Sequence, residues 1–494
     1  MVRSVPTELR GSLVVMAAVL ASYGSALWLE GAAHLHVDIV IQAVALTWTL
    51  AWTQREADLV ERGLGFVVLP AVAMGAAGTD QLMSESSVRG DAVFALAVAF
   101  SIWIRRFGAR ATRAGTLAAL PFVATLVVQG PISLPPGAAR DGHVLWMGLV
   151  ALISAGCVLV VQVGAGWLGL TARVPARRST GPLVPPRAAA SRMLPSTRMA
   201  LQMGVSLGGA FLAGHWLFPD HWTWAVLTAF IVCSGARGRA DVLFKGVTRA
   251  LGAAFGTAVA SAIVGAFGPG DRWAIVLLFG VLALATWLRP LNYAYWAACV
   301  TAAFSLLYGY FGETTLDVLT QRLQAILVGA VLGITVSWLL APVRTLDVVR
   351  RRIADALSVL TDVLRASRPA ELRLQQGRFE EAVKLLEQIA PPLRAQRAVA
   401  SRLGGRRAYL ADAIDAVRDC AEPVRDVRVN PGAEAVLANI TAARLAIGRV
   451  PGPSYQAAAV EAGGLGDIDE AVGRVVRVFP TTPARVDLAK ASRD

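Results

Sequence analysis

Two basic residues and two glycines share one face of a predicted helix near the middle of the chain. Lys245, Arg249, Gly252 and Gly256 are spaced 4, 3 and 4 residues apart, and residues at these intervals lie on the same side of an α-helix. Two cations attract an anion, and glycines let a ligand or a second helix approach the backbone. We predict that these four residues bind an anionic substrate. Contacts with lipid headgroups for the cations, and helix packing for the glycines, are the alternatives.

A second polar pair begins the apolar segment 291–311. Asn292 and Tyr295 are three residues apart, so they also share a helix face. Together they could hydrogen-bond a flat organic anion, and we predict that they contribute to substrate binding. We assign their neighbours Tyr293 and Trp296 to the aromatic belt found at membrane interfaces.

Histidine and aspartate cluster at two predicted turns. His36 and Asp38 lie at the first turn, and His215 and His221 lie at the corresponding turn of the second half. Histidine titrates near neutral pH, so Asp38, His36, His215 and His221 are our candidates for proton coupling. Ordinary polar residues at a water-exposed turn are the alternative. Histidine and carboxylate can also ligate metals, but this spacing is not diagnostic, and no metal and no cofactor is expected.

Two motifs of common enzymes are missing from the sequence. It contains no GxxxxGK[ST] phosphate-binding loop and no HExxH. The segment GAGWLG at 164–169 lies at the end of an apolar segment and not between a strand and a helix. We therefore expect no enzymatic activity and no ATPase domain of the P-loop kind.

Composition identifies a membrane protein. The 494 residues are 55% hydrophobic and only 16% charged, whereas a soluble protein carries about 25% charged residues. The mean hydropathy is +0.55. Long apolar segments recur as far as Ala341, and charge density rises after Pro342. The net charge is +13, but the membrane loops account for many of the basic residues, and no nucleic-acid partner is predicted.

Twelve apolar segments fit a membrane-spanning length. Six lie in each half of the membrane part, at 11–29, 35–52, 64–80, 91–104, 116–130, 144–170, 199–217, 221–235, 248–267, 272–288, 291–311 and 322–341. We predict an all-α membrane protein with about twelve transmembrane helices.

Loop charge predicts the orientation of these segments. With the N-terminus inside, nineteen Lys and Arg residues fall on the cytoplasmic side and four on the other. Such a bias is typical of membrane proteins with positive loops inside. It predicts that both termini are cytoplasmic.

A weak internal repeat and a change in composition divide the chain. ADLVERG at 57–63 matches ADVLFKG at 240–246. This indicates two parallel six-helix repeats with a substrate site between them, although chance similarity between apolar segments is the alternative. The predicted membrane halves are 1–172 and 199–341, and the linker between them is 173–198. A cytoplasmic helical domain at 342–451 and a poorly ordered tail at 452–494 are predicted to follow.

The segment from Trp222 to Gly256 resembles the fusaric acid resistance-like family, also called aromatic acid exporters. The resemblance rests on WAVLTAFIV, which begins at Trp224, and on the Lys245, Arg249, Gly252 and Gly256 pattern. A similar pattern is seen in plant aluminium-activated malate transporters. The family often carries threonine where this chain has Ala253.

These resemblances imply different functions. The family implies proton-driven export of aromatic carboxylates across a bacterial inner membrane, and the malate transporters imply a passive anion channel. A membrane scaffold whose helical tail binds a partner is a third hypothesis. The expected partners are an organic anion and the lipid bilayer, and a homodimer is left open.

Overall fold

The computed structural model of the chain describes residues 5–54, 59–128, 142–170, 193–264, 267–312, 316–404, 409–429, 432–458 and 464–480. All regular elements in these ranges are helices. The chain divides into two compact units. Unit 1 comprises most of the chain before Pro342, and unit 2 comprises the chain from Pro342 onward together with Arg237–Asp241. Most of the predicted linker, 173–198, lies outside the described residues.

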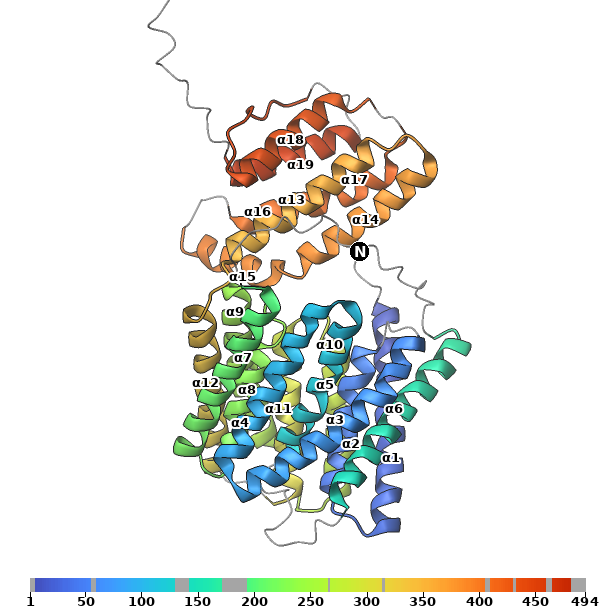
Figure 1. Ribbon diagram of the computed structural model, residues 1–494, viewed down its shortest axis with the longest axis vertical. Coiled ribbons are helices and arrows are strands. Elements are labelled where there is room, and N and C mark those ends of the chain that lie inside the picture. Colours follow the sequence, from blue (N-terminus) through green and yellow to red (C-terminus); the bar gives the residue numbers. More distant parts are fainter. Residues whose placement is uncertain are drawn as a thin grey trace, which may run out of the picture. The chain divides into compact units, whose positions relative to one another are not determined.

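Unit 1 consists of helices α1 to α12, whose axes run roughly parallel to one another (Figure 1). A helix overlaps each of the twelve predicted apolar segments. Their bounds are α1 Val5–Ala33, α2 Asp38–Thr53, α3 Leu59–Glu85, α4 Ser87–Trp103, α5 Ala109–Val128, α6 His143–Trp167, α7 Pro195–Leu217, α8 Trp222–Cys233, α9 Arg239–Val264, α10 Arg272–Leu288, α11 Tyr293–Tyr310 and α12 Leu316–Leu339. A 3-10 turn, Ile104–Phe107, follows α4.

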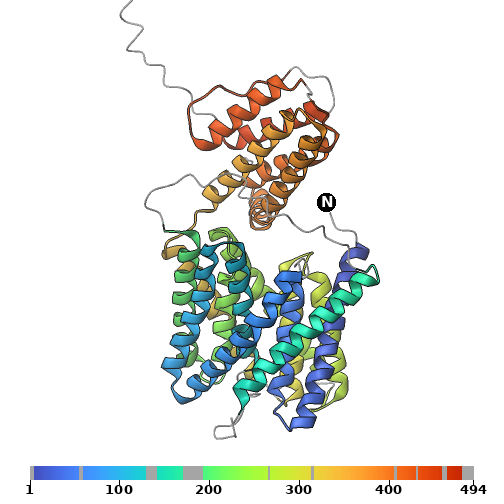
Figure 2. The same cartoon turned by 45° about the vertical axis from the view of Figure 1, so that its right-hand side comes forward.

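Helices from the two predicted halves are packed into one another. α4 packs along α7, α7 along α8, and α1 against α10. Phe94 of α4 makes edge-to-face contacts with Phe122 of α5 and Phe211 of α7, at 5.2 and 5.6 Å between ring centroids. α6 lies along α3 and is tilted relative to its neighbours (Figure 2). The first six helices are therefore not a separate bundle.

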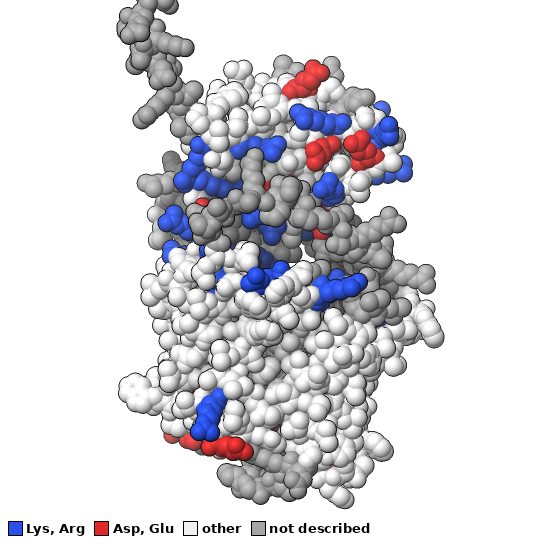
Figure 3. Space-filling model, viewed as in Figure 1, with Lys and Arg blue, Asp and Glu red and all other residues white. Residues whose placement is uncertain are grey.

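Length and composition confirm a multi-pass membrane protein. Within the described residues, seven helices are long and apolar enough to cross a membrane, and α2, α8 and α10 are shorter apolar helices. Figure 3 shows a broad uncharged band on one face of unit 1, with charged residues toward its ends. Twelve crossings, two parallel repeats and cytoplasmic termini stay predictions.

The tryptophan–alanine motif at the start of α8 lies in a close helix contact. A Cβ atom at Gly329 of α12 would overlap the backbone of Ala225, so only glycine allows these two backbones to lie so close. Ala225 and Trp224 are both buried. The motif therefore joins α8 to α12 tightly, which positions the second half of the membrane unit.

Unit 2 is a helical unit with its own apolar core. Its helices are α13 Thr345–Leu364, α14 Pro369–Glu387, α15 Ala390–Arg402, α16 Leu410–Asp419, α17 Ala421–Asp426, α18 Glu434–Gly448 and α19 Gly464–Val478. Pro391 and Pro392 stand in the first turn of α15, where proline is tolerated, so the boundary between α14 and α15 lies immediately before them.

The prediction of a poorly ordered tail, 452–494, was wrong for α19. Ile468, Val472 and Val475 are at most 1% exposed and belong to the core of unit 2. Their spacing of four and three residues places them on one helix face. The glycines before this segment hid the pattern. Residues 481–494 of the predicted tail lie outside the described residues.

An ion-pair network joins α15 to α16. Arg394 and Arg397 approach Asp415 at 2.6 and 2.9 Å, and Arg418 approaches it at 3.3 Å. Burial alone would raise the pKa of the Asp415 carboxyl, but the hydrogen bonds and positive charge of the three arginines hold it below its ordinary value. Asp415 is therefore stabilised in its ionised form.

Candidate functional site

A long cavity of about 750 Å³ lies inside the membrane unit. Its lining residues on α2 run from Val37 to Thr53, which corresponds to about 24 Å of helix. A hydrocarbon core is about 30 Å thick, so this length corresponds to most of the thickness of a bilayer core. The cavity is therefore long enough to form a passage along α2.

Both predicted halves contribute to the cavity wall. The lining residues come from α1, α2, the turn after α4 and α5 in the first half, and from α8, α9, α10 and α11 in the second. A site between the halves is the position that two parallel repeats would give.

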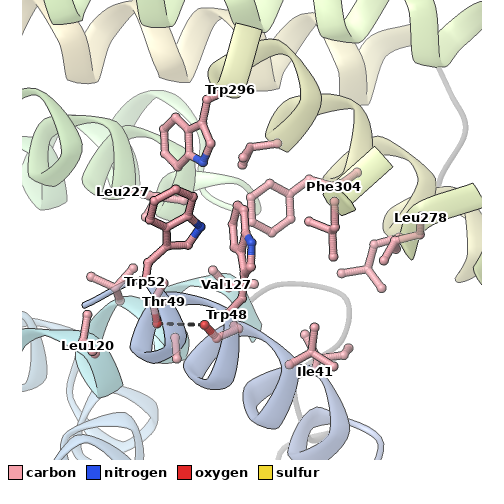
Figure 4. A pocket seen from close by; sticks show the side chains of 18 of the residues that line it. Ile41, Trp48, Thr49, Trp52, Leu120, Val127, Leu227, Leu278, Trp296 and Phe304 are labelled. Atoms are coloured by element: carbon pink, nitrogen blue, oxygen red, sulfur yellow. Dashed lines mark hydrogen bonds between the residues drawn. The ribbon is translucent and has the colours of Figure 1, made fainter. Parts of the chain in front are cut away.

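Three tryptophans form an aromatic surface at one end of this cavity. Trp48 and Trp52 project from α2 toward Trp296 of α11 (Figure 4). The rings of Trp48 and Trp296 are stacked with centroids 6.3 Å apart. The indole nitrogen of Trp48 donates a hydrogen bond to the Thr286 hydroxyl of α10 at 2.9 Å, which fixes the ring orientation. A planar ligand could stack on these rings.

Three cations lie at the same end of the cavity as Trp52. The Nζ atom of Lys245 donates a hydrogen bond to the carbonyl oxygen of Ser234, just beyond α8, at 3.0 Å. The Arg289 guanidinium lies over the rings of Trp52 and Trp296, at 4.7 and 5.6 Å from their centroids. Arg105 follows α4 and also lines the cavity. Among the described lining residues these are the only basic ones, and the loop charges place all three at the predicted cytoplasmic end.

The opposite end of the cavity carries a negative charge. Glu30 near the end of α1 is the only acidic residue among the described lining residues. Tyr23 and Leu27 lie on the same helix face, seven and three residues before it. Tyr310 and Phe311 contribute from the end of α11. The passage therefore has a cationic end and an anionic end, with apolar walls between them.

Of the four residues in the predicted anion-binding stripe, only Lys245 lines the cavity. Arg249 is 0% exposed, and its Nη1 atom donates a hydrogen bond to the Thr301 hydroxyl of α11 at 3.3 Å. A Cβ atom at Gly252 would lie 2.7 Å from the carbonyl oxygen of Ala294. A Cβ atom at Gly256 would overlap the same helix. Arg249, Gly252 and Gly256 thus face α11. The two glycines occupy packing positions, which was the alternative interpretation.

The structure places the polar pair of α11, Asn292 and Tyr295, outside the cavity lining. Asn292 caps the helix, since its Oδ1 atom accepts a hydrogen bond from the amide of Ala294 at 3.0 Å. Tyr295 is 53% exposed. Tyr293 and Trp296 line the cavity instead. Sequence spacing finds residues that share a face, but it does not show which face meets the substrate.

The proton-coupling candidates form two histidine–aspartate clusters outside the cavity lining. The Oδ atoms of buried Asp38 lie 3.3 Å from His36 Nδ1 and 3.9 Å from His143 Nε2. His215 Nε2 lies 2.9 Å from Asp91 Oδ2.

His221, also a candidate, is 8% exposed and immediately precedes α8. The partners His143 and Asp91 were not predicted, because they are distant in the sequence. In the described part of the chain, no group of three His, Cys, Asp or Glu residues could hold a metal ion.

Comparison with known proteins supports the membrane part. The family described as fusaric acid resistance protein-like matches residues 209–336, which include α8 to α11 and most of α12. Neither the curated proteins nor the solved structures gave a match. The predicted resemblance to the fusaric acid resistance-like family is thus confirmed over residues 209–336, and this match to a membrane-protein family fits a role in export or transport.

Proposed function

We propose that the protein exports organic anions, specifically aromatic carboxylates, through the cavity of the membrane unit. The observation that carries this proposal is the combination of Trp48, Trp52 and Trp296 with Lys245 and Arg289 at one end of the cavity. An aromatic carboxylate has a planar ring and one negative charge, and this end of the cavity offers a partner for each.

Simple energetics favour such a ligand over a neutral or inorganic one. A carboxylate about 4 Å from a cation gains about 4 kcal/mol at an effective dielectric constant of 20. Ring stacking adds about 0.5–1.5 kcal/mol beyond the burial of apolar area. Both contributions require one molecule to carry an aromatic ring and a charge.

The proposed energy source is the proton gradient, and the proposed location is a bacterial inner membrane. The sequence contains no P-loop motif, so a secondary mechanism is the simplest one. With the cationic end on the cytoplasmic side, as the loop charges predict, the substrate would bind from the cytoplasm and leave at the Glu30 end.

Anion flux in proteoliposomes tests the proposal. Purified protein would be reconstituted with 4-hydroxybenzoate, benzenesulfonate and malate in turn, with and without an imposed pH gradient and with protein-free vesicles as the leak control. We expect gradient-driven flux of the aromatic anions that a protonophore abolishes. Lys245→Ala and Arg289→Ala should each lower the flux at least tenfold.

Arg110→Ala is the matched control for these variants. Arg110 is an exposed basic residue at the predicted cytoplasmic end of α5 and does not line the cavity. Its replacement should leave flux unchanged. Full flux in both Lys245→Ala and Arg289→Ala would contradict the assignment of the binding end.

A passive anion channel is the second candidate function. It is favoured by the continuous lining of the cavity along α2, from Val37 to Thr53. Bilayer recordings distinguish the two, because a channel gives steady anion current without a proton gradient, whereas a carrier shows none.

A further inference from the structure

Glu30 has a position that no other acidic residue of the described chain shares. It lines the passage at the end opposite to Lys245, Arg289 and Arg105. A substrate anion that leaves the cationic end must pass this carboxylate. A negative charge on Glu30 would therefore oppose the exit of an anion at this end.

The titratable and charged groups around this end of α1 come from each helix packed against it. α2, α6 and α10 pack against α1, and α11 faces Glu30 across the cavity. These groups are Tyr23 on α1, His34 directly after α1, His36 and Asp38 at the start of α2, His143 on α6, Asp271 and Arg272 at the start of α10, and Tyr310 on α11. Only Tyr23 and Tyr310 line the cavity with Glu30.

We propose that Glu30 is the proton-binding group that couples anion export to proton entry. This inference rests on the proposed transport function. A proton from the outer solution binds the Glu30 carboxylate, the neutral side chain lets the anion leave, and the proton is released to the cytoplasm when the cavity next opens there. One proton enters for each anion that leaves.

Electrostatic repulsion gives the size of the effect. Two negative charges about 8 Å apart at an effective dielectric constant of 20 repel each other enough to lower the occupancy of the anion about 30-fold. Protonation of Glu30 removes this repulsion. Flux through the outer end should therefore rise about 30-fold as Glu30 becomes protonated.

Neither histidine–aspartate cluster has this arrangement. Asp38 is paired with His36 and His143, and Asp91 is paired with His215, and none of these residues lines the cavity. Their protonation would alter a helix contact and would not directly change the charge met by the substrate.

The test compares wild type with Glu30→Gln, Glu30→Asp and Glu85→Gln in proteoliposomes held at zero membrane potential. The main probe is benzenesulfonate, whose charge is constant near neutral pH, so any pH dependence belongs to the protein. If wild type carries only 4-hydroxybenzoate, that anion is used with leak correction. An internal pH-sensitive dye reports anion-driven proton movement.

Glu85 is the matched control because it is an exposed carboxylate at the same predicted outer side, at the end of α3, and does not line the cavity. We expect Glu30→Gln to carry the anion down its gradient with less than about twofold pH dependence and without proton counterflow. Glu30→Asp and Glu85→Gln should keep both coupling and pH dependence.

The outcomes separate the two levels of the proposal. Proton counterflow that persists in Glu30→Gln would overturn the assignment of Glu30 while leaving transport intact. A second set of results would also overturn it: Glu30→Gln loses all flux, Glu30→Asp loses coupling, and Glu85→Gln keeps normal coupling. The Glu30 carboxylate would then be needed for the passage of the anion itself. Absence of anion flux in wild type would refute the transport function.

Discussion

Arg249 of α9 donates a hydrogen bond to Thr301 of α11 from a position with no solvent exposure. The Nε and Nη2 atoms of Arg249 have no hydrogen-bond partner among the described residues. A buried cation without a charged partner destabilises a protein, and ionisable groups inside a membrane usually have a function. Arg249 therefore lowers the stability of the fold, and we expect it to have a function in transport. Its replacement should raise stability and lower transport.

Arg249→Met is expected to raise the thermal unfolding temperature and to lower anion flux at least tenfold. The gain in stability should be about 1–4 kcal/mol, because a side chain of similar length without the charge removes the desolvation cost. Thermal unfolding in detergent and flux in proteoliposomes would be measured on the same preparations. Unchanged flux would show that Arg249 serves only the structure.

Gly252→Ala should destabilise the membrane unit. The added methyl group would lie 2.7 Å from the carbonyl oxygen of Ala294 and 2.8 Å from the Cβ atom of Ala297, so α9 and α11 must separate. Overpacking of this kind costs about 1–3 kcal/mol. Gly208→Ala on α7 is the control, since nothing lies within 4 Å of its Cβ position. Equal unfolding temperatures for the two variants would contradict the close packing.

The His215–Asp91 pair should stabilise the contact between α7 and α4 without setting the pH dependence of transport. The two side chains are 2.9 Å apart, and His215 also packs on Trp222 at 4.7 Å between ring centroids. In a double-mutant cycle of His215→Gln and Asp91→Asn, the coupling energy in thermal unfolding should be about 1–3 kcal/mol. A pH profile of flux that disappears in His215→Gln would instead support the original proton-coupling prediction.

The network around Asp415 should lose its stabilising effect in acid. The pKa of Asp415 is depressed in the folded protein, so its contribution is full above the unfolded value of about 3.9 and decreases as pH falls below it. Hydrogen exchange of peptides from α15 and α16, corrected for intrinsic rates, would measure this in the full chain. Asp415→Asn should lower the free energy of opening measured by exchange near neutral pH by about 2 kcal/mol. This value lies between the contributions of exposed and of buried salt bridges.

In that experiment, peptides from α18 serve as the internal reference. Wild type and Asp415→Asn should converge in acid. A constant difference between them at all pH values would refute the electrostatic explanation.

The helices of the membrane unit were largely predictable, because each depends on a local run of apolar residues. For example, the segment 64–80 lies in α3, and the segment 91–104 lies in α4 and the first residue of the turn after it; both helices are among those long enough to cross a membrane. α19 was missed because its core-facing residues follow a glycine-rich stretch. Local patterns therefore located most elements but not every helix end.

The cavity was less predictable, because its residues meet only through packing of distant helices. Lys245 was found from its spacing with Arg249, yet Arg249 and the two glycines of that stripe contact α11 and do not line the cavity. Arg289 stood alone in its loop, and Trp48 and Trp52 resembled ordinary residues of an apolar helix. Glu30 resembled an acidic residue at a membrane interface. No local pattern connects these residues.

The apolar walls between the two charged ends have a consequence for small inorganic ions. Between Trp48 and Glu30 the lining is formed mainly by residues such as Val44, Ile41 and Leu278, which cannot replace lost water of hydration. A chloride ion would have to give up its hydration shell without compensation, whereas an organic anion brings an apolar body that such walls accept. The middle of the passage would thus select organic anions over chloride by the cost of dehydration. Export of organic acids would then not dissipate a chloride gradient across the membrane.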